Sequence, residues 1–306
     1  MSSLLVFPGQ GAQRAGMLHG LAPQWLEQAS EVLGEDVLQL DSAQALQSTR
    51  AVQLCLLIAG VAASRRLLEQ APAPDYVAGL SIGAYPAAVV AGALGFEDAL
   101  RLVSLRGELM QQAYPQGYGM TAIIGLDLAA VEGLLAQVHS DSTPVYLANI
   151  NADNQVVIAG SDEAMATVAR HARGQGAGKA CRLAVSVPSH CPLLETPART
   201  LAQAFADVPL QALALGYLSG SRARPVIAPQ ALRDDLAFNM CRVVDWRGTV
   251  QSAYERGVRL QIELPPGAVL TGLARRVFES GTVMAYDGAR LDTLQTLLAE
   301  EGRRQP

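Results

Sequence analysis

The sequence predicts an α/β protein with a large domain built on a parallel sheet and a small domain inserted into it. Short apolar runs alternate with longer helical runs at both ends of the chain, as in a parallel sheet covered by helices. Between residues 120 and 186 the order of the runs changes. The 306 residues, 50% of them hydrophobic, can bury one large core with a smaller insert. We therefore expect a large domain at residues 1–119 and 187–306 and an inserted domain at residues 120–186.

The large domain is expected to begin with a buried strand. Residues 4–7 are apolar throughout and run into a Pro-Gly-Gln-Gly turn, which ends the strand. Residues 96–112 place apolar side chains on one face and charges on the other, as an amphipathic helix does. The predicted elements of this domain are strands at residues 4–7, 76–78 and 260–264 and helices at residues 54–68, 84–90, 96–112, 193–205 and 250–256.

The segment that interrupts the large domain predicts a small fold of its own. Its strand and helix patterns follow in the order β-α-β-β-α-β, which is the ferredoxin-like split unit. An Asn-rich turn at residues 149–154 connects the two central strands. The predicted strands lie at residues 121–124, 145–149, 156–159 and 181–185, and the predicted helices at residues 128–138 and 164–173.

Composition narrows the class of protein and partner. The longest apolar run, residues 54–63, is too short to span a bilayer, and the first residues lack the basic flank of a signal peptide. We therefore expect a cytoplasmic protein with no membrane partner. A formal net charge of −5 argues against nucleic acid as a partner. The four cysteines form no Cys-x-x-Cys pair and have no histidine partner at metal-ligand spacing, so no metal site is predicted.

Gly79, Ser81 and Gly83 form the most informative motif. They follow an apolar run at residues 76–78 and precede a helix-forming run at residues 84–90. Strand, Gly-x-Ser-x-Gly and helix in this order are the sequence form of a nucleophile elbow, in which a strained turn exposes a serine hydroxyl. The large domain is thus expected to be α/β-hydrolase-like, with Ser81 as nucleophile. The alternative is a glycine-bearing turn with an idle serine.

A serine hydroxyl needs a base, and at neutral pH histidine is the usual one. The chain offers four histidines. His139 and His171 lie near the ends of predicted helices, where solvated side chains are the ordinary expectation, and His19 follows the first turn. His190 lies between two prolines on the loop that re-enters the large domain, so its angle is fixed. We favour His190 as the base; capping or packing of the next helix is the alternative.

Acyl transfer also needs backbone N–H donors aimed at the developing oxyanion. The elbow offers the N–H of Ile82, the residue after the serine. The turn that follows the first strand offers the N–H of Gln10. A tight strand-to-helix connection without chemistry explains that turn equally well.

Five motifs occur in order along the chain. They are Phe7-Pro8-Gly9-Gln10-Gly11-Ala12-Gln13, the serine elbow, Arg106-Gly107, Ser186-Val187-Pro188-Ser189-His190 and Pro266-Gly267-Ala268-Val269-Leu270-Thr271-Gly272-Leu273. Together they resemble the malonyl-CoA:acyl carrier protein transacylase family over nearly the whole chain. The elbow sequence Gly-Leu-Ser-Ile-Gly-Ala-Tyr-Pro most resembles that of the malonate decarboxylase epsilon subunit. Leu80 and Ala84 depart from the family, which usually has histidine and glutamate there.

The resemblance implies a set of site residues. Arg106 matches the family arginine that grips the free carboxylate of malonyl, and a planar guanidinium suits this because it donates two parallel hydrogen bonds. The implied residues are Ser81 and His190 as the catalytic pair, the backbone N–H groups of Gln10 and Ile82 as the oxyanion hole, Arg106 and Gln53 in substrate binding, and Asn239, whose backbone carbonyl orients the histidine.

The function implied is acyl transfer by a ping-pong mechanism without a bound cofactor. Ser81 takes the malonyl group from malonyl-CoA and passes it to the thiol of a phosphopantetheine-type arm on an acyl carrier protein. The resemblance of the elbow identifies this partner as the carrier subunit of malonate decarboxylase. Two alternatives stay open: a serine hydrolase or thioesterase of short acyl esters, and a non-catalytic subunit that only docks a carrier protein.

Overall fold

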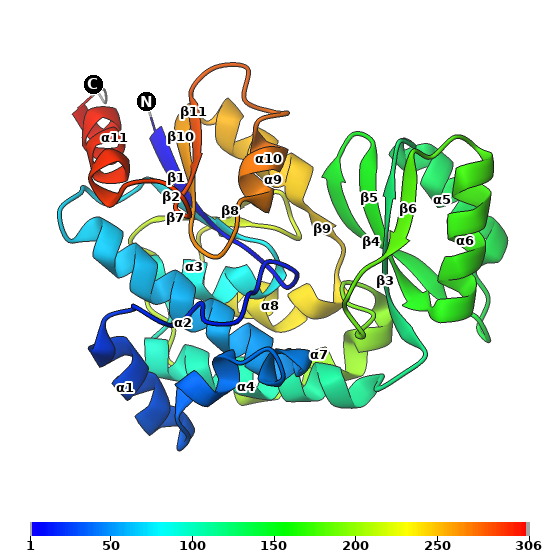
Figure 1. Ribbon diagram of the computed structural model, residues 1–306, viewed down its shortest axis with the longest axis horizontal. Coiled ribbons are helices and arrows are strands. Elements are labelled where there is room, and N and C mark those ends of the chain that lie inside the picture. The colour runs from blue at the N-terminus through cyan, green and yellow to red at the C-terminus, as the bar shows by residue number, and fades with distance from the viewer. Residues whose placement is uncertain (1, 304–306) are drawn as a thin grey trace.

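The computed structural model describes residues 2–303, and the strands in that range form two sheets (Figure 1). The first sheet has the strand order β11-β10-β1-β2-β7-β8. Neighbouring strands from β11 to β7 run parallel, and β8 adds an antiparallel edge. The predicted α/β class is therefore confirmed. The strands are β1 (Ser2–Phe7), β2 (Tyr76–Gly79), β7 (Gly216–Ser219), β8 (Arg224–Val226), β10 (Val258–Glu263) and β11 (Thr282–Ala285).

Helices cover both faces of this sheet because successive side chains of a strand point to opposite sides. Leu5 and Phe7 of β1 lie in a core formed with α1 to α4, α7, α8 and α11. Leu4 and Val6 lie in a second core formed with α9 and α10. The helices are α1 (Pro23–Leu33), α2 (Thr49–Leu68), α3 (Ala84–Val90), α4 (Phe96–Ala113), α7 (Glu195–Ala204), α8 (Pro229–Phe238), α9 (Trp246–Glu255), α10 (Val269–Ala274) and α11 (Leu291–Arg303).

Helix α2 contains the apolar run at residues 54–63. The whole helix has 20 residues and, by length and composition, is long and apolar enough to cross a membrane, although the run by itself is too short. Of its most apolar window, 83% is buried inside the protein. Its side chains belong to the core beneath the parallel sheet, so α2 is a core helix.

The second sheet has the strand order β6-β3-β5-β4-β9. The pairs within β6-β3-β5-β4 are antiparallel, which is the ferredoxin-like arrangement that the order of elements predicts. Helices α5 and α6 cover one face with a core of their own. The elements are β3 (Tyr118–Ile124), α5 (Leu128–Val138), β4 (Val145–Ala152), β5 (Gln155–Ser161), α6 (Asp162–Gly174) and β6 (Lys179–Arg182).

Strand β9 (Val244–Asp245) joins the two parts of the chain. It belongs to the segment expected in the large domain, yet it pairs in parallel with β4 at Asn149 and Ile150. The second sheet is thus completed by residues outside 120–186. The assignment of residues 120–186 to a separate domain stays a prediction.

The last strand of the insert ends earlier than expected. The strand predicted at residues 181–185 exists, but its bounds are wrong, because β6 runs from Lys179 to Arg182. The Arg182 guanidinium donates to the carbonyl oxygens of Tyr118, Met120, Leu183 and Val185, at 2.6, 3.2, 3.0 and 2.7 Å. These bonds satisfy the carbonyls of Leu183 and Val185, while the Leu183 N–H still donates to the Met120 carbonyl of β3 at 2.9 Å. Residues 183–185 therefore leave the sheet as a linker after this last strand contact.

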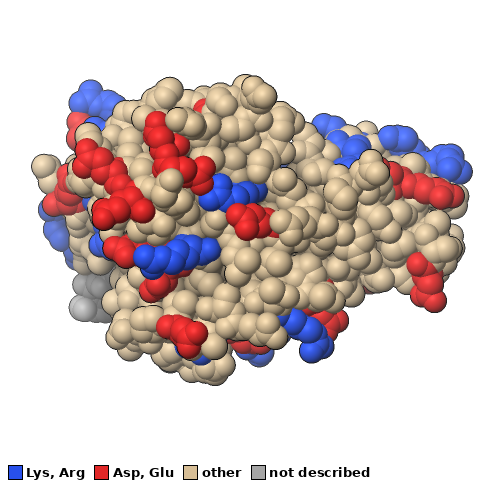
Figure 2. Space-filling model, turned by 90° about the horizontal axis from the view of Figure 1, so that it is seen from below, with Lys and Arg blue, Asp and Glu red and all other residues tan. Residues whose placement is uncertain are grey.

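The lower face of the molecule carries a mixed charge pattern (Figure 2). On the face that is drawn, Lys and Arg are interspersed with Asp and Glu, and wide areas carry no charge. Such interspersed charges create no extended field of a single sign across this face.

The backbone at the end of β2 lies too close to its neighbours for a side chain. A Cβ on Gly79 would lie 1.9 Å from the carbonyl carbon of Gly83, and one on Gly83 would lie 2.2 Å from the Phe7 carbonyl oxygen. Both glycines of the elbow are therefore required by packing. They let β2 turn into α3 while the turn rests against the end of β1.

Gly79→Ala should destabilise the fold by about 1–3 kcal/mol or more, because the new methyl group overlaps backbone that cannot move aside. Urea unfolding measures the change. Gly133→Ala is the matched control: Gly133 is exposed on α5, and a Cβ added there would have no neighbouring atom within 4 Å. It should gain up to about 1 kcal/mol from helix propensity. Equal stability of wild type and Gly79→Ala would contradict the packing argument.

Candidate active site

Strand β2 ends at Gly79, and after Leu80 the chain enters a short 3-10 turn (Ser81–Gly83) that starts with Ser81 and leads into α3. Its φ is +56°, a left-handed conformation that is strained for a residue other than glycine. The Leu80 N–H donates to the Phe7 carbonyl at 3.0 Å and holds the turn against β1. The turn therefore has the geometry of the predicted nucleophile elbow, with the hydroxyl lining a cavity.

His190 lies beside this hydroxyl. Its Nε2 is 2.8 Å from Ser81 Oγ, and its Nδ1 is 2.7 Å from the Asn239 carbonyl oxygen. Because a carbonyl can only accept, the Nδ1–H donates to it and Nε2 is free to accept the serine proton. Within residues 2–303 the ring bonds to no carboxylate, so a main-chain carbonyl takes the place of the acid in a triad.

The surroundings of His190 keep its imidazole neutral. Burial lowers the pKa of His190 to about 4, with a further contribution from the nearby positive charge of Arg106. Its φ is +64°, and its own N–H donates to the Met240 carbonyl at 2.7 Å, so the loop is fixed at this point. At neutral pH the ring is a neutral base already in contact with the serine.

Arg106 is fully buried on α4 and is held by neutral groups. One terminal nitrogen donates to Gln53 Oε1 at 2.7 Å, and the other to Asn239 Oδ1 at 3.0 Å and Ser81 Oγ at 3.3 Å. Within residues 2–303 no carboxylate pairs with it, and its Nε has no hydrogen-bond partner. Burial lowers its pKa to about 10, which leaves it charged at neutral pH. The site thus holds an uncompensated cation beside the serine.

The position of Arg106 depends on how closely α4 packs on α2. A Cβ on Gly107 would lie 2.5 Å from the Arg50 Cα of α2, so only glycine permits this approach. The preceding residue of α4 can then point under the elbow and reach Gln53 of α2. In the Arg106-Gly107 pair, Gly107 allows the close helix contact, and this contact places the Arg106 side chain.

The Gln10 turn meets the elbow from the other side. A Cβ on Gly9 would lie 2.9 Å from the Leu80 carbonyl oxygen, which shows how close the two loops are. The Gln10 side chain accepts a hydrogen bond from Gln53 Nε2 at 3.2 Å. In the described part of the chain the Gln10 N–H has no acceptor. The roles of the Gln10 and Ile82 N–H groups as an oxyanion hole stay predictions.

The serine and histidine open into a cavity of about 400 Å³ between the two sheets. Its wall on the second sheet carries the amide side chains of Asn149, Asn151 and Gln155, which were not predicted from the sequence as site residues. The Asn-rich run at residues 149–154 was the available signal, but its first half continues β4 and is not only a turn. The remaining lining includes Pro8 to Gln13, Leu80, Met120, Ala122, Val157, residues 183–185, Val269 and Leu270.

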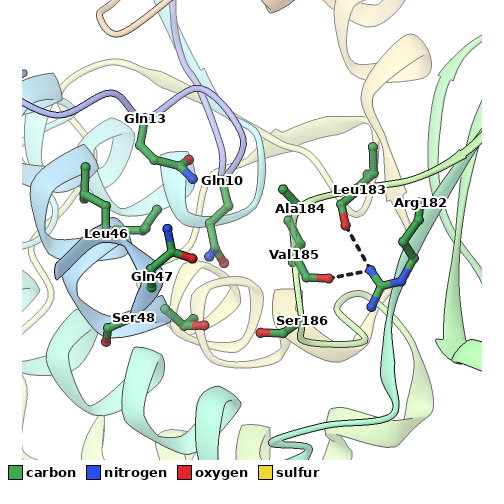
Figure 3. A pocket seen from close by; sticks show the side chains of 12 residues that line it. Gln10, Gln13, Leu46, Gln47, Ser48, Arg182, Leu183, Ala184, Val185 and Ser186 are labelled. Carbon is green, nitrogen blue, oxygen red and sulfur yellow. Dashed lines mark hydrogen bonds between the residues drawn. The ribbon is translucent and has the colours of Figure 1, made fainter. Parts of the chain in front are cut away.

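A second cavity of about 380 Å³ adjoins the first (Figure 3). Both are lined by Gln10, Gln13 and the linker at residues 183–185. Figure 3 shows Gln47 and Ser48 on the opposite side, with Arg182 bonded to the linker. The linker that Arg182 holds is therefore a shared wall of the two cavities.

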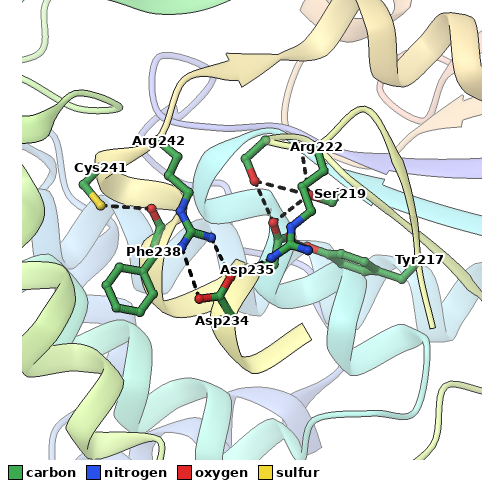
Figure 4. Close-up of polar contacts among 9 residues, drawn as sticks. Tyr217, Ser219, Arg222, Asp234, Asp235, Phe238, Cys241 and Arg242 are labelled. Carbon is green, nitrogen blue, oxygen red and sulfur yellow. Dashed lines mark hydrogen bonds and ion pairs between the residues drawn. The ribbon is translucent and has the colours of Figure 1, made fainter. Parts of the chain in front are cut away.

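Helix α8 is anchored to β7 by a buried carboxylate (Figure 4). Asp235 is 1% exposed and accepts hydrogen bonds from the hydroxyls of Ser219, Ser221 and Tyr217, at 2.6, 2.7 and 2.9 Å. A buried carboxylate is tolerated when donors satisfy its oxygens, as they do here. The C-terminal end of α8, where Asn239 follows, is thereby fixed relative to the sheet.

The turn after α8 is held by a half-exposed cluster beside this anchor. Asp234 pairs with Arg242 at 2.6 Å and with Arg222 at 2.7 Å (Figure 4). Hydrogen bonds from Arg242 hold the pKa of Asp234 below its usual range despite partial burial. The pair with Arg242 spans the turn and keeps the Asn239 carbonyl aimed at His190.

Other candidate groups lie outside the site. His139 ends α5, where its Nδ1 is 3.1 Å from the Val145 carbonyl oxygen, and His171 lies on α6. Cys191 follows His190 but is buried, and burial raises its pKa to about 12, so it is a protonated thiol at neutral pH. Among residues 2–303 no group of three His, Cys, Asp or Glu could hold a metal ion.

Comparison with known proteins finds relatives that match nearly the whole chain. Residues 4–297 match the family described as "Acyl transferase domain". The malonyl CoA-acyl carrier protein transacylase of Haemophilus influenzae is 39% identical over 285 residues, 89% of this chain and 91% of that protein. The structure of the same enzyme from Coxiella burnetii superposes with a TM-score of 0.92 at 35% identity, covering 98% of both chains. A malonyl-transacylase solved with a type II PKS acyl-carrier protein gives 0.90 at 36% identity, covering 97% and 99%.

The rate at which Ser81 is modified should fall at acid pH, where His190 becomes protonated. In Arg106→Met this fall should begin at a higher pH than in wild type. The charge of Arg106 lowers the pKa of His190, so its removal raises that pKa from about 4 toward the ordinary value. Below the raised pKa the rate should fall about tenfold for each unit of pH. The rate at which phenylmethylsulfonyl fluoride, an uncharged reagent, modifies Ser81 measures this between about pH 4.5 and 8.

Arg101→Met is the control for this measurement. Arg101 lies on the same helix but is exposed and pairs with Glu97, so its loss should leave the profile unchanged. A fall that begins at the same pH in Arg106→Met as in wild type would show that Arg106 does not influence the base.

Proposed function

The chain belongs to the acyl transferase domain family, and from this membership we propose that it moves a malonyl group from coenzyme A to the thiol of an acyl carrier protein through an ester on Ser81. The observation that carries the proposal is the buried Arg106 cation, which lies 3.3 Å from the serine hydroxyl without a carboxylate partner in residues 2–303. A malonyl group brings the carboxylate that this cation lacks.

In the first half-reaction the Ser81 oxygen attacks the thioester carbonyl while His190 Nε2 takes the serine proton. The carbonyl oxygen becomes an oxyanion that the N–H groups of Gln10 and Ile82 would stabilise. When the C–S bond breaks, the imidazolium returns the proton to the sulfur of coenzyme A. The product is a malonyl ester of Ser81.

The second half-reaction runs the same steps with a different thiol. The thiol of the carrier's phosphopantetheine arm gives its proton to His190 and attacks the ester carbonyl. The bond to Ser81 breaks, and the serine oxygen takes the proton back. The enzyme returns to its starting state, so no cofactor is consumed.

The cavity supports a substrate with an amide-bearing arm. Asn149, Asn151 and Gln155 line the wall opposite the serine, and each amide can both donate and accept. Coenzyme A and the carrier protein present the same pantetheine chain with two peptide-like amides. We propose that both substrates place this chain along the amide wall, so that one cavity serves both half-reactions.

Two other functions are less well supported. A hydrolase of neutral acyl esters has no use for a buried guanidinium at the nucleophile, whose desolvation is costly. A subunit that only docks a carrier protein has no use for a serine and histidine 2.8 Å apart at a strained elbow. Acyl transfer uses both features.

We further propose that the carrier served is the subunit of malonate decarboxylase. The support is the wording of the elbow, where Leu80 and Ala84 stand in place of the usual histidine and glutamate. Leu80 lines the cavity beside Ser81, and Ala84 is buried at the start of α3. The cytoplasm is the compartment proposed for this reaction.

Ser81→Ala should abolish a malonyl adduct that wild type acquires from malonyl-CoA, because the ester oxygen is lost. Intact-protein mass followed by peptide mapping locates the adduct. Removing the nucleophile should lower transfer to the carrier by at least about 10³-fold. A malonyl group on Cys191 or on any residue other than Ser81 would refute the proposed intermediate.

The carrier itself can be identified by competition. With malonyl-Ser81 enzyme, we expect kcat/KM at least about tenfold higher for the carrier subunit of malonate decarboxylase than for a fatty-acid acyl carrier protein. Both carriers are used with their phosphopantetheine arm attached, and the forms without the arm are the controls. Equal or better transfer to the fatty-acid carrier would reject the decarboxylase assignment but leave malonyl transfer intact.

A further inference from the structure

Asn239 makes hydrogen bonds to three other residues of the site, one through its main chain and two through its side chain. Its main-chain carbonyl accepts from His190, its side-chain Oδ1 accepts from Arg106 at 3.0 Å, and its Nδ2 donates to the Ser81 carbonyl oxygen at 3.3 Å. The residue is only 4% exposed. The role expected from the sequence belongs to its carbonyl only and leaves the side-chain contacts unexplained.

The orientation of the Asn239 amide follows from its neighbours. A guanidinium can only donate, so the oxygen must face Arg106. A main-chain carbonyl can only accept, so the NH₂ group must face Ser81. Both ends of the amide are used, and neither bond could form with the group turned over.

We propose that the side chain of Asn239 is a positioning residue for acyl selectivity: it holds the Arg106 guanidinium beside Ser81 and leaves its charge free for a ligand carboxylate. This inference rests on the proposed function, since it concerns the carboxylate of a malonyl group. Gln53 does the same at the other terminal nitrogen, through Oε1 at 2.7 Å.

The two oxygens that accept from Arg106, on Asn239 and Gln53, belong to neutral amides, so neither neutralises the positive charge of Arg106. A carboxylate in place of either amide would form a buried ion pair with Arg106, whose guanidinium is already desolvated, and the low dielectric of the interior strengthens the attraction between the two charges. That pair would compete with the substrate for the same cation. An amide oxygen instead holds the guanidinium group in place by a hydrogen bond and adds no negative charge.

The backbone around Asn239 is built to keep this geometry. Asp235 ties α8 to β7, and the Asp234 pair with Arg242 spans the turn that follows. The Asn239 amide also donates a hydrogen bond to the carbonyl oxygen of Ser81. Ser81 has a strained backbone conformation, with a φ of +56°. The guanidinium and the elbow are therefore held by one rigid turn.

Asn239→Asp tests the inference, because it is isosteric and keeps the main-chain carbonyl that orients His190. We expect the ratio of the acylation rates with malonyl-CoA and acetyl-CoA to fall about tenfold or more. The ratio is the readout because the variant also loses the Nδ2 donor to the Ser81 carbonyl, which changes both rates together. Asn239→Gln, which restores a neutral amide, should keep the preference for malonyl over acetyl. Arg106→Ala sets the benchmark for complete loss of that preference.

A second readout does not depend on any thioester. Free malonate should protect Ser81 of wild type from phenylmethylsulfonyl fluoride by binding Arg106, and Asn239→Asp should lose this protection. Gln53→Glu places a carboxylate on the other nitrogen and should lose it as well, which covers the case of an Asn239→Asp protein that does not fold.

The outcomes separate this inference from the proposed function. Protection by malonate that survives in both acidic variants overturns the positioning role. Parallel loss of malonyl, acetyl and sulfonyl modification in Asn239→Asp and Asn239→Gln also overturns it, because the side chain would then serve only the elbow and the base. A wild type that malonate protects but malonyl-CoA does not acylate overturns the proposed function and leaves this inference standing.

Discussion

The close contact between the end of β1 and the elbow after β2 is the constraint on which the site depends. The Gly83 backbone lies against the Phe7 carbonyl, and Gly9 lies against the Leu80 carbonyl, at separations that exclude a side chain. Because the two parallel strands end side by side, the loops that follow them meet at the same edge of the sheet. Ser81 and Gln10 come together there although they are far apart in the sequence. The glycines place the Ser81 hydroxyl, and the other residues of the candidate site lie around it.

A second constraint is electrostatic. Arg106 is buried without a carboxylate partner in residues 2–303, and its charge lowers the pKa of the adjacent base. Burying this cation costs desolvation free energy when the protein folds, and the hydrogen bonds to the two amides offset only part of that cost. Such an arrangement destabilises the empty protein and favours a ligand that supplies the missing charge. The same cation helps to keep His190 neutral, so ligand recognition and the availability of the base have a common physical origin.

The cavity exists because the chain leaves one sheet, builds another and returns. Arg182 binds the carbonyls of residues 183 and 185, which follow β6, and this returning segment forms a wall of the cavity before it reaches His190. Strand β9 pairs with β4 and ties the second sheet to the segment that follows Asn239. The amide side chains of the second sheet therefore line the same cavity as Ser81 and His190. In the proposed function the second sheet contributes a surface for the substrate, while the parallel sheet contributes the reacting groups.

The sequence by itself determined the local elements and the ordered motifs. Helices α3 and α5 begin and end where the pattern predicts, because capping, apolar periodicity and glycine positions are local properties. It also singled out Ser81 and His190, whose neighbours along the chain restrict their backbone. The short strands β7, β8, β9 and β11 and the six-residue helix α10 were not predicted, since such brief segments are stabilised by their partners in space. Helices α1, α8 and α11 were not predicted either, although α1 and α11 carry an amphipathic pattern over 11 and 13 residues that could have indicated them.

Only the tertiary structure decided how these pieces meet. The early end of β6 follows from carbonyl contacts of Arg182 to residues as distant as Tyr118, which no local pattern contains. The side-chain bonds of Asn239 to Arg106 and Ser81 join positions 133 and 158 residues apart. A sequence names the groups that can do chemistry because side-chain chemistry is local. Their distances, their burial and hence their charge states depend on which distant segments pack around them, and that is a property of the folded chain.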